Sequence, residues 1–250
     1  MSSKRIYRNT ADGIRLKSFP VTVKETDLWV AVSSNSYYEQ LPGETEQLVW
    51  QKRLILEAYL EHNPDFAKSF EPFLLQAAAP DIIGSMVKAG NLAGVGPMAA
   101  VAGMIAEEAG KHLLQKSPEV IVENGGDIFL KVVKPVNIGI YAGSSPLSGK
   151  LALQINPLQT PLGVCTSSGT VGPSHSMGRA DAAVVVSESC ALADAAATAM
   201  GNIVQSPEDL QAALEFAKNI KGVSGALVIC SDHVAAWGDI ELQKVSPKKA

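Results

Sequence analysis

Residues 163–202 constrain the fold of this chain most, because they join a polar loop to two apolar runs of different kinds. The first run, residues 182–186, is short, ends in three valines and lies between polar residues, which predicts a buried strand. The second run, residues 191–200, is rich in alanine and follows a Ser-Glu-Ser sequence that suits the start of a helix. We therefore expect a binding loop that is held between elements of the core.

Hydrophobic patterns elsewhere predict a mixture of helices and antiparallel strands. The sequence Asn124-Gly125-Gly126-Asp127 lies between two apolar runs and is a strong signal for a tight hairpin. Strands and helices do not alternate strictly, which favours an α+β fold over a doubly wound one. Strands are expected at residues 6–34, 120–122, 128–133, 138–142, 151–155, 163–166 and 226–230, continuing one sheet up to residue 166, with a polar tail at the end of the chain. Helices are expected at residues 44–61, 65–75, 80–89, 97–116 and 207–219.

Length and composition exclude several classes of protein. The 250 residues, of which 46% are hydrophobic, suffice for a single domain over residues 1–250 or for two intimately joined α+β halves. The net charge of −4 includes no basic block, which argues against a nucleic-acid partner. No apolar run approaches the roughly 20 residues of a membrane helix, and the start of the chain lacks the apolar region of a signal peptide. We therefore expect a cytoplasmic protein without a membrane partner.

A glycine-rich loop precedes the helix expected at residues 97–116. Its sequence from Gly94 to Ala99 matches the dinucleotide-binding pattern G-x-G-x-x-A, but that pattern needs a strand directly before it, and residues 87–92 resemble a helix end. Such a loop can still offer backbone N–H groups and carbonyls to a phosphate or to a metal–phosphate unit. The sequence leaves open whether Gly94 and Gly96 bind a ligand or only let the helix pack closely.

Hydroxyl side chains gather directly after the strand expected at residues 163–166. Thr166, Ser167 and Ser168 precede Gly169, and their hydroxyls can donate hydrogen bonds to phosphate or ribose oxygens without adding charge. An ordinary Ser/Thr turn is the more frequent outcome for such a cluster. Both readings remain open at this point.

One histidine lies in the loop that follows. Ser174 and His175 offer a hydroxyl and a titratable imidazole, so His175 is the candidate catalytic residue, although a lone histidine is more often structural. Cys165 could act with His175 as a nucleophile, but no residue that would orient the pair is identifiable, and a thiol in a strand is usually inert. The chain has three cysteines without CxxC spacing, which argues against a disulfide framework and a thiolate metal site.

Asp194 and Thr198 form the sharpest pair of candidate ligands. On the helix expected at residues 191–200 they are four residues apart and share a face, so a carboxylate and a hydroxyl point to the same region. Such oxygen donors suit Mg²⁺, which takes few protein ligands and completes its shell with phosphate and water. The alternative is an Asp in the first turn that only interacts with the helix dipole. Neighbouring alanines weigh against that alternative, because an unpaired charge on such a crowded surface is costly.

Five motifs, taken in order, resemble those of the ApbE superfamily. The chain has G-V-G before a small-residue helix, E-N-G-G-D-I at a hairpin, T-S-S-G after a strand, S-H in the following loop and A-D-A-A-A-T later, all within residues 94–202. The superfamily usually has a Gly-rich segment that opens a helix, then N-x-G-G-D, T-S-G, S-H-x-x-D-P-x-T-G and A-D-A-x-A-T. The start of the chain carries no signal segment, so the chain is similar to the short, uncharacterised cytosolic branch.

The resemblance implies a T-fold-like α+β architecture and, from the well-studied branch, a Mg²⁺-dependent FAD:protein FMN transferase. Such an enzyme splits the pyrophosphate of FAD and moves FMN onto a Thr or Ser of an acceptor protein. It further implies that Asp194 and Thr198 bind the metal, with a backbone carbonyl near Gly94 as another candidate, and that His175 transfers a proton. The positions implied to line the flavin nucleotide site are Gly125, Gly126, Asp127, Ser168 and Gly169.

The loop after His175 departs from the superfamily pattern. The chain has Ser-Met-Gly-Arg-Ala-Asp at residues 176–181 where the enzymes have their D-P-x-T-G turn. Either Arg179 and Asp181 replace the contacts of that turn or transfer activity is absent. We thus weigh a Mg²⁺-dependent enzyme that acts on FAD against a non-catalytic flavin-binding or accessory protein, which the resemblance connects with anaerobic sulfur assimilation into homocysteine. A plain interaction scaffold and self-association into a homo-oligomer also stay open.

Overall fold

The computed structural model describes residues 15–75, 78–169 and 177–245. Its largest feature is an eight-stranded antiparallel sheet in the order β1-β2-β3-β4-β7-β8-β9-β10. The strands of this sheet are β1 (Leu16–Val23), β2 (Thr26–Ser33), β3 (Val120–Asn124), β4 (Asp127–Lys131), β7 (Leu162–Ser167), β8 (Ala182–Ser187), β9 (Val223–Cys230) and β10 (His233–Gly238). A second sheet contains β11 (Glu241–Lys244), β6 (Leu151–Ile155) and β5 (Val136–Gly139).

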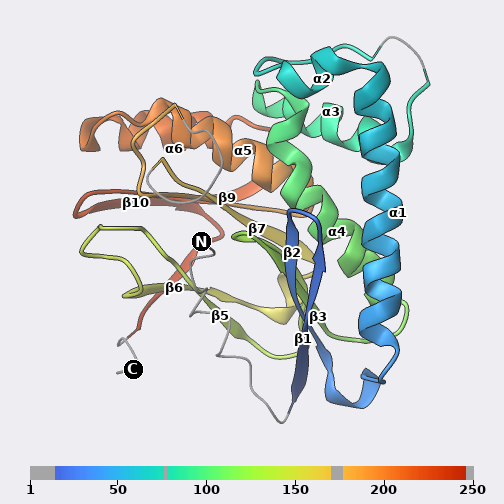
Figure 1. Cartoon of the computed structure of the whole chain (residues 1–250). Coiled ribbons are helices and arrows are strands. Elements are labelled where there is room, and N and C mark those ends of the chain that lie inside the picture. The colour runs from blue at the N-terminus through green and yellow to red at the C-terminus, as the bar shows by residue number, and fades with distance from the viewer. Residues whose placement is uncertain (1–14, 76–77, 170–176, 246–250) are drawn as a thin grey trace.

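Helices cover one face of the large sheet, and the small sheet lies against the other face (Figure 1). Because side chains alternate along a strand, Val185 packs toward the helices while Val184 and Val186 pack toward the small sheet. Burial on both faces explains why β8 is apolar without interruption. The helices are α1 (Leu41–His62), α2 (Pro64–Lys68), α3 (Asp81–Ala93), α4 (Val101–Leu114), α5 (Cys190–Ile203) and α6 (Leu210–Lys218).

Most predicted elements are confirmed, and the α+β class is confirmed with them. The hairpin closes with Asn124 paired to Asp127, and Ser189 caps α5 by accepting a hydrogen bond from the backbone N–H of Leu192 at 3.3 Å. The helix expected at residues 65–75 is shorter and ends at Lys68. The helix expected to stop at residue 89 instead continues to Ala93, where Gly94 ends it in a left-handed conformation.

Two predictions about the sheets are wrong. Strands β5 and β6 do not continue the large sheet, because β6 pairs with β11 from the end of the chain, with Glu241 opposite Gln154. The expected polar tail forms β10 and β11 instead. These strands are edge or solvent-facing elements, so their side chains carry little of the hydrophobic signal on which the prediction depended. The single-domain organisation stays a prediction.

The sequence also predicts one apolar stripe on the helix that follows the glycine-rich loop, and the structure confirms part of it. Of its members Met98, Val101, Ala102, Ile105 and Ala109, the last two are buried. Val101 and Ala102 are only half-buried, whereas Met104 and Ala106 are fully covered. The cause is the 3₁₀ turn η3 (Pro97–Ala100), which precedes α4 and has about three residues per turn instead of 3.6.

Candidate functional site

The candidate site lies where α4 and α5 cross above strands β4 and β7. The backbone N–H of Gly103, near the start of α4, donates a hydrogen bond of 2.8 Å to Oδ2 of Asp194. A Cβ atom at Gly103 would lie 2.5 Å from the carbonyl oxygen of Cys190 and 2.8 Å from Cβ of Asp194. Only glycine therefore allows the two helices to approach closely enough for Asp194 to reach the start of α4.

Thr198 lies on the same side of α5 as Asp194. From Cys190 to Met200 these are the two residues that remain partly exposed, since every other residue of that stretch is buried. The spacing of four residues accounts for the shared direction. A carboxylate and a hydroxyl thus emerge together from a helix that otherwise packs by small apolar side chains, as the sequence predicted.

The charge of a second carboxylate, that of Asp127, acts on Asp194. Asp127 begins β4 and is buried, and its burial raises the pKa from 3.8 to about 7, although hydrogen bonds from the Cys165 thiol and the Thr166 backbone lower it. Burial also raises the pKa of Asp194 well above its usual range. The charge of Asp127 raises it further, against hydrogen bonds from the Gly103 and Ala102 backbone. The charge of Glu123 in turn raises the pKa of Asp127, so three carboxylates make this a region that favours a cation.

Two further groups at this site were not singled out from the sequence. The side-chain amide of Asn124 donates a hydrogen bond of 3.0 Å to the carbonyl of Ala102, which ties the hairpin to the start of α4. Ala102 is adjacent to Gly103, whose N–H contacts Asp194, so the carbonyl of Ala102 is a further candidate ligand beside the carbonyl predicted near Gly94. A backbone carbonyl carries no signal in the sequence, whereas Asn124 belongs to the hairpin motif and could have been considered.

Glu107 joins the two helices beside the site. One oxygen of its buried carboxylate accepts hydrogen bonds from the backbone N–H of Ala191 at 3.1 Å and the hydroxyl of Ser189 at 3.3 Å. Its other oxygen pairs with Lys111 at 2.6 Å. A carboxylate at the start of α5 satisfies N–H groups that have no partner within the helix. Glu107 therefore fixes α5 relative to α4.

The glycines of the predicted loop have local structural tasks. Gly94 has a φ of 75° as the residue that ends α3. A Cβ atom at Gly96 would lie 1.8 Å from the carbonyl oxygen of Ser69, so the absent side chain makes room for that segment. Close packing thus explains Gly96, and ligand binding by Gly94 and Gly96 stays a prediction.

The hydroxyl cluster lies at the end of β7. Ser167 and Ser168 are mostly buried, and Thr166 is partly exposed. The backbone N–H of Gly169 donates to the carbonyl of Ala180 at 2.9 Å. Gly125 and Gly126 form the hairpin turn on the neighbouring strands with positive φ, and Cβ of Gly126 would lie 3.7 Å from the carbonyl oxygen of Thr166. The hairpin and the hydroxyl cluster are therefore side by side, and their contact with a nucleotide stays a prediction.

Part of the predicted loop lies outside the described residues. Residues 170–176 include Ser174 and His175, so the role of this histidine stays a prediction. The described part begins at Met177, whose backbone N–H donates to the side chain of Asn202 at 2.9 Å. Arg179 has an exposed side chain, and its backbone N–H donates to the carbonyl of Val204 at 2.7 Å. These contacts anchor the end of the loop on the C-terminal end of α5.

Asp181 has a structural task within the described residues. Its carboxylate is buried and accepts a hydrogen bond of 2.7 Å from the backbone N–H of Ser231, at the turn between β9 and β10. Its own N–H donates to the carbonyl of Ile229 at 2.9 Å. The departure from the superfamily motif at Asp181 therefore supports the adjoining hairpin.

Gly178 makes the closest approach in this segment, and we expect Gly178→Ala to destabilise the protein. Its Cβ atom would lie 1.9 Å from the carbonyl oxygen of Gly201, so the loop end or α5 must shift. The free energy of unfolding should fall by about 1–3 kcal/mol in denaturant titrations. Gly139→Ala is the control, because a Cβ atom there meets nothing within 4 Å. Equal stabilities of the two variants would contradict the close approach.

The thiols do not support a nucleophilic cysteine. Cys165 is fully buried, its sulfur lies 3.5 Å from that of Cys190, and burial raises its pKa well above the usual value. A thiol with a raised pKa carries little thiolate at neutral pH. Cys165, Cys190 and Cys230 are all free, as the spacing predicted.

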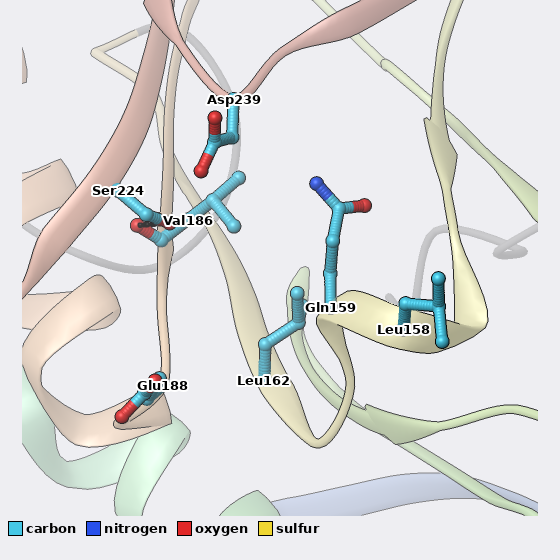
Figure 2. Close-up of a pocket in the computed structure, with 7 residues that line it drawn as sticks. All are labelled: Leu158, Gln159, Leu162, Val186, Glu188, Ser224 and Asp239. Atoms are coloured by element: carbon cyan, nitrogen blue, oxygen red, sulfur yellow. Dashed lines mark hydrogen bonds between the residues drawn. The ribbon is translucent and has the colours of Figure 1, made fainter.

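A separate cavity of about 210 Å³ lies at the other end of β7 (Figure 2). It is bounded by the first residue of that strand, Leu162, by the turn η4 (Pro157–Gln159) and by the exposed carboxylates of Glu188 and Asp239. None of the predicted site residues lines it. The cavity is therefore distinct from the region of Asp127 and Asp194.

The described residues also limit other kinds of site. No group of three or more His, Cys, Asp or Glu side chains is placed to hold a metal ion in that part of the chain. Within the same residues no single helix has the length and apolar character of a membrane span. The helix pair Asp81–Ala93 and Pro97–Leu114, which is bent by 105°, has that length and apolar composition only when the two segments are taken together.

The architecture belongs to the class of ApbE flavin-transferase folds. The structure matches the apo form of the flavinyl transferase ApbE from Pseudomonas stutzeri with a TM-score of 0.52 and 16% identity, over 89% of this chain and 94% of that chain. It matches the ApbE protein from Thermotoga maritima with a TM-score of 0.55 and 13% identity, over 88% and 96% of the two chains. At these identities the similarity shows the fold, and it confirms the predicted ApbE-type architecture.

Comparison of the sequence with known families and relatives shows the family of this chain. A family model described as "AbpE bacteria" matches residues 8–242, and the chain belongs to this family. The UPF0280 protein of Methanocella arvoryzae is 47% identical over 191 residues, which are 76% of this chain and 78% of the relative. The UPF0280 proteins of Methanosarcina barkeri and Methanocaldococcus jannaschii are each 41% identical, over 89% and 91% of this chain and 88% and 93% of the relatives.

Proposed function

We propose that the protein binds FAD together with Mg²⁺ at the Asp127–Asp194 region and splits the FAD pyrophosphate, with transfer of FMN to an acceptor protein. The observation that carries the proposal is the Asp194 carboxylate, which the N–H of Gly103 holds beside the start of α4, with Thr198 on the same side of α5 and the charge of Asp127 acting on it. Such an arrangement favours a bound cation. The solved proteins of the same fold are flavin transferases, which supports a flavin as the ligand.

The residues at the site fit Mg²⁺. Asp194 offers a carboxylate, Thr198 a hydroxyl on the same side of the helix, and Ala102 a backbone carbonyl held by Asn124. Mg²⁺ is usually bound by one or two carboxylates and takes its other ligands from water and substrate phosphates. A set of so few protein donors therefore suits an ion that also contacts a pyrophosphate.

The chain's own residues would do three things in the proposed reaction. The start of α4 would hold Asp194 in place through the N–H of Gly103. The hydroxyl cluster at the end of β7 would hydrogen-bond the nucleotide, and His175 would take the proton from the acceptor hydroxyl. Bound Mg²⁺ would supply charge neutralisation on the pyrophosphate.

A cytoplasmic location stays a prediction.

The test is to incubate the purified protein with FAD, with and without Mg²⁺, and to measure AMP by chromatography and FMN adducts by mass spectrometry. Mg²⁺-dependent AMP release supports the enzyme. Tight FAD binding without AMP or adduct favours the alternative, a non-catalytic flavin-binding or accessory protein. The specific observation behind that alternative is Asp181, which supports the β9–β10 turn where the transferases have a different motif. Absence of FAD binding in both conditions would overturn both functions.

We expect His175→Ala to separate chemistry from binding. Removing a general base should slow AMP release about 100-fold while the dissociation constant for FAD changes little, because the imidazole acts on the acceptor proton. His62→Ala, on the exposed end of α1, is the control and should change neither quantity. A parallel loss of FAD affinity would assign His175 to binding instead.

A further inference from the structure

Two polar contacts join α4 to α5 on the helical face of the large sheet (Figure 1). The first is the hydrogen bond of 2.8 Å from the N–H of Gly103 to Asp194. The second lies four residues further along α4, where Oε2 of Glu107 accepts hydrogen bonds from Ala191 and Ser189 at 3.1 and 3.3 Å. Residues four apart share a face of a helix, so both contacts belong to one crossing. A single contact would let α5 turn about it, whereas two separate contacts restrict that rotation.

The Glu107 carboxylate is held firmly at the start of α5. It is buried, and it accepts from the N–H of Ala191, which has no carbonyl partner within α5. The hydroxyl of Ser189, which donates to Glu107, itself accepts from the N–H of Leu192 at 3.3 Å. Lys111 pairs with the other oxygen of Glu107 at 2.6 Å, so the charge of this carboxylate is compensated locally. Glu107 is therefore placed to act on the site through position rather than through its charge.

The place of Asp194 depends on how α5 lies against α4. Gly103 is the third residue of α4, so its N–H has no carbonyl partner within that helix and is available to Asp194. At a donor–acceptor distance of 2.8 Å, a shift of α5 by about 1 Å would take this contact beyond the range of a hydrogen bond. Thr198, one turn further along α5, would move with Asp194. The attachment at Glu107 opposes such a shift.

We propose that Glu107 is a positioning residue for the cation site, which holds Asp194 and Thr198 in place through the start of α5. The inference rests on the proposed function where it concerns Mg²⁺. Where it concerns the contact between Gly103 and Asp194, it can be tested without any ligand.

The Mg²⁺ affinity of the folded protein measures the effect on the site. Glu107→Ala removes the acceptor for Ala191 and Ser189, so the dissociation constant from equilibrium dialysis should rise roughly 10- to 100-fold. Glu108→Ala is the matched control, because it changes the next carboxylate of α4, which pairs with Lys52 of α1 at 2.5 Å, and it should leave the constant unchanged. A residue that only stabilised the fold would not alter the affinity of folded molecules. Unchanged affinity in folded Glu107→Ala would therefore overturn the proposal.

Glu107→Gln separates position from charge. Glutamine keeps an oxygen that can accept from Ala191 and Ser189, and it loses only the pair with the exposed Lys111. The Mg²⁺ dissociation constant should therefore return to within about threefold of the original. A Glu107→Gln variant that binds Mg²⁺ as weakly as Glu107→Ala would show that Glu107 acts by its charge, against the proposal.

A milder variant serves if circular dichroism shows that Glu107→Ala is not folded. Ser189→Ala removes one of the two donors to Glu107, and it should raise the Mg²⁺ dissociation constant about threefold. An unchanged constant in Ser189→Ala would then count against the proposal.

Hydrogen exchange of the Gly103 amide, followed by NMR in metal-free protein, tests the attachment itself. Glu107→Ala should speed this exchange at least about tenfold, because the hydrogen bond to Asp194 opens more often, whereas Glu107→Gln and Glu108→Ala should not. If the unchanged protein binds no Mg²⁺ but Glu107→Ala still speeds the exchange, the proposed function fails and the positioning of Asp194 by Glu107 stands. Equal exchange at Gly103 in Glu107→Ala and the unchanged protein would refute the positioning role.

Discussion

Asp194→Asn is expected to abolish Mg²⁺ binding at the site while making the metal-free protein more stable. Asparagine keeps an oxygen that can accept the hydrogen bond from Gly103, so the crossing of α4 and α5 is retained. It removes a carboxylate whose ionisation is opposed by burial and by the charge of Asp127. Mg²⁺ affinity should fall at least about 100-fold, because a neutral amide cannot replace a charged ligand of a hard cation.

The gain in stability separates this result from simple misfolding. The free energy of unfolding of the metal-free variant should rise by roughly 1–3 kcal/mol at pH 8, since an unfavourable partly buried charge is absent. Equilibrium dialysis with Mg²⁺ and denaturant titration in chelator measure the two effects. A variant with lower stability and lower Mg²⁺ affinity would point to a structural role for Asp194.

A matched control identifies the place of binding. Asp239→Asn changes an exposed carboxylate that lines the separate cavity of Figure 2. It should leave Mg²⁺ affinity unchanged. If Asp239→Asn lowers the affinity and Asp194→Asn does not, the cation binds at that cavity and the proposed site is wrong.

The parts of this protein that sequence could predict depend on local interactions. The hairpin at Asn124–Asp127 follows from turn chemistry within four residues, and the start of α5 follows from a Ser cap. The pair Asp194 and Thr198 follows from helix periodicity. Each of these features is determined by neighbours in the chain, so one sequence is enough to specify it.

The parts that could not be predicted depend on contacts between distant residues. The pairing of Glu241 with Gln154 joins strands from different regions of the chain, and no local pattern encodes it. The electrostatic coupling of Asp127 and Asp194 likewise requires β4 and α5 to be placed together first. The resemblance assigns Asp127 to a nucleotide site, but nothing in the sequence indicates that this carboxylate acts on Asp194.

Metal-free protein should lose stability as the pH rises from about 4 to about 7, whereas carboxylates with lowered pKa values make a protein more stable as the pH rises. The pKa of Asp127 is raised from 3.8 in the unfolded chain to about 7 in the folded protein. The folded state therefore binds a proton that the unfolded state releases, and this contribution to stability is complete below pH 4 and lost as the pH rises through 7. The difference corresponds to about 4 kcal/mol. Asp194, whose pKa is also raised, acts in the same direction.

Denaturant titrations at several pH values measure this effect, and Asp127→Asn should flatten the curve over the same range. Glu25, Glu44 and Asp209 do not confuse the result, because their pKa values are lowered and their contribution changes only in more acidic solution. Burial lowers the pKa of His112 from 6.5, which makes the protein more stable as the pH rises, so the comparison with Asp127→Asn is needed to separate the contribution of Asp127. Saturating Mg²⁺ should reverse the slope, since the ion competes with the protons for the carboxylates and binds more tightly as the pH rises. A slope that Mg²⁺ leaves unchanged would mean that the two carboxylates titrate without holding a metal.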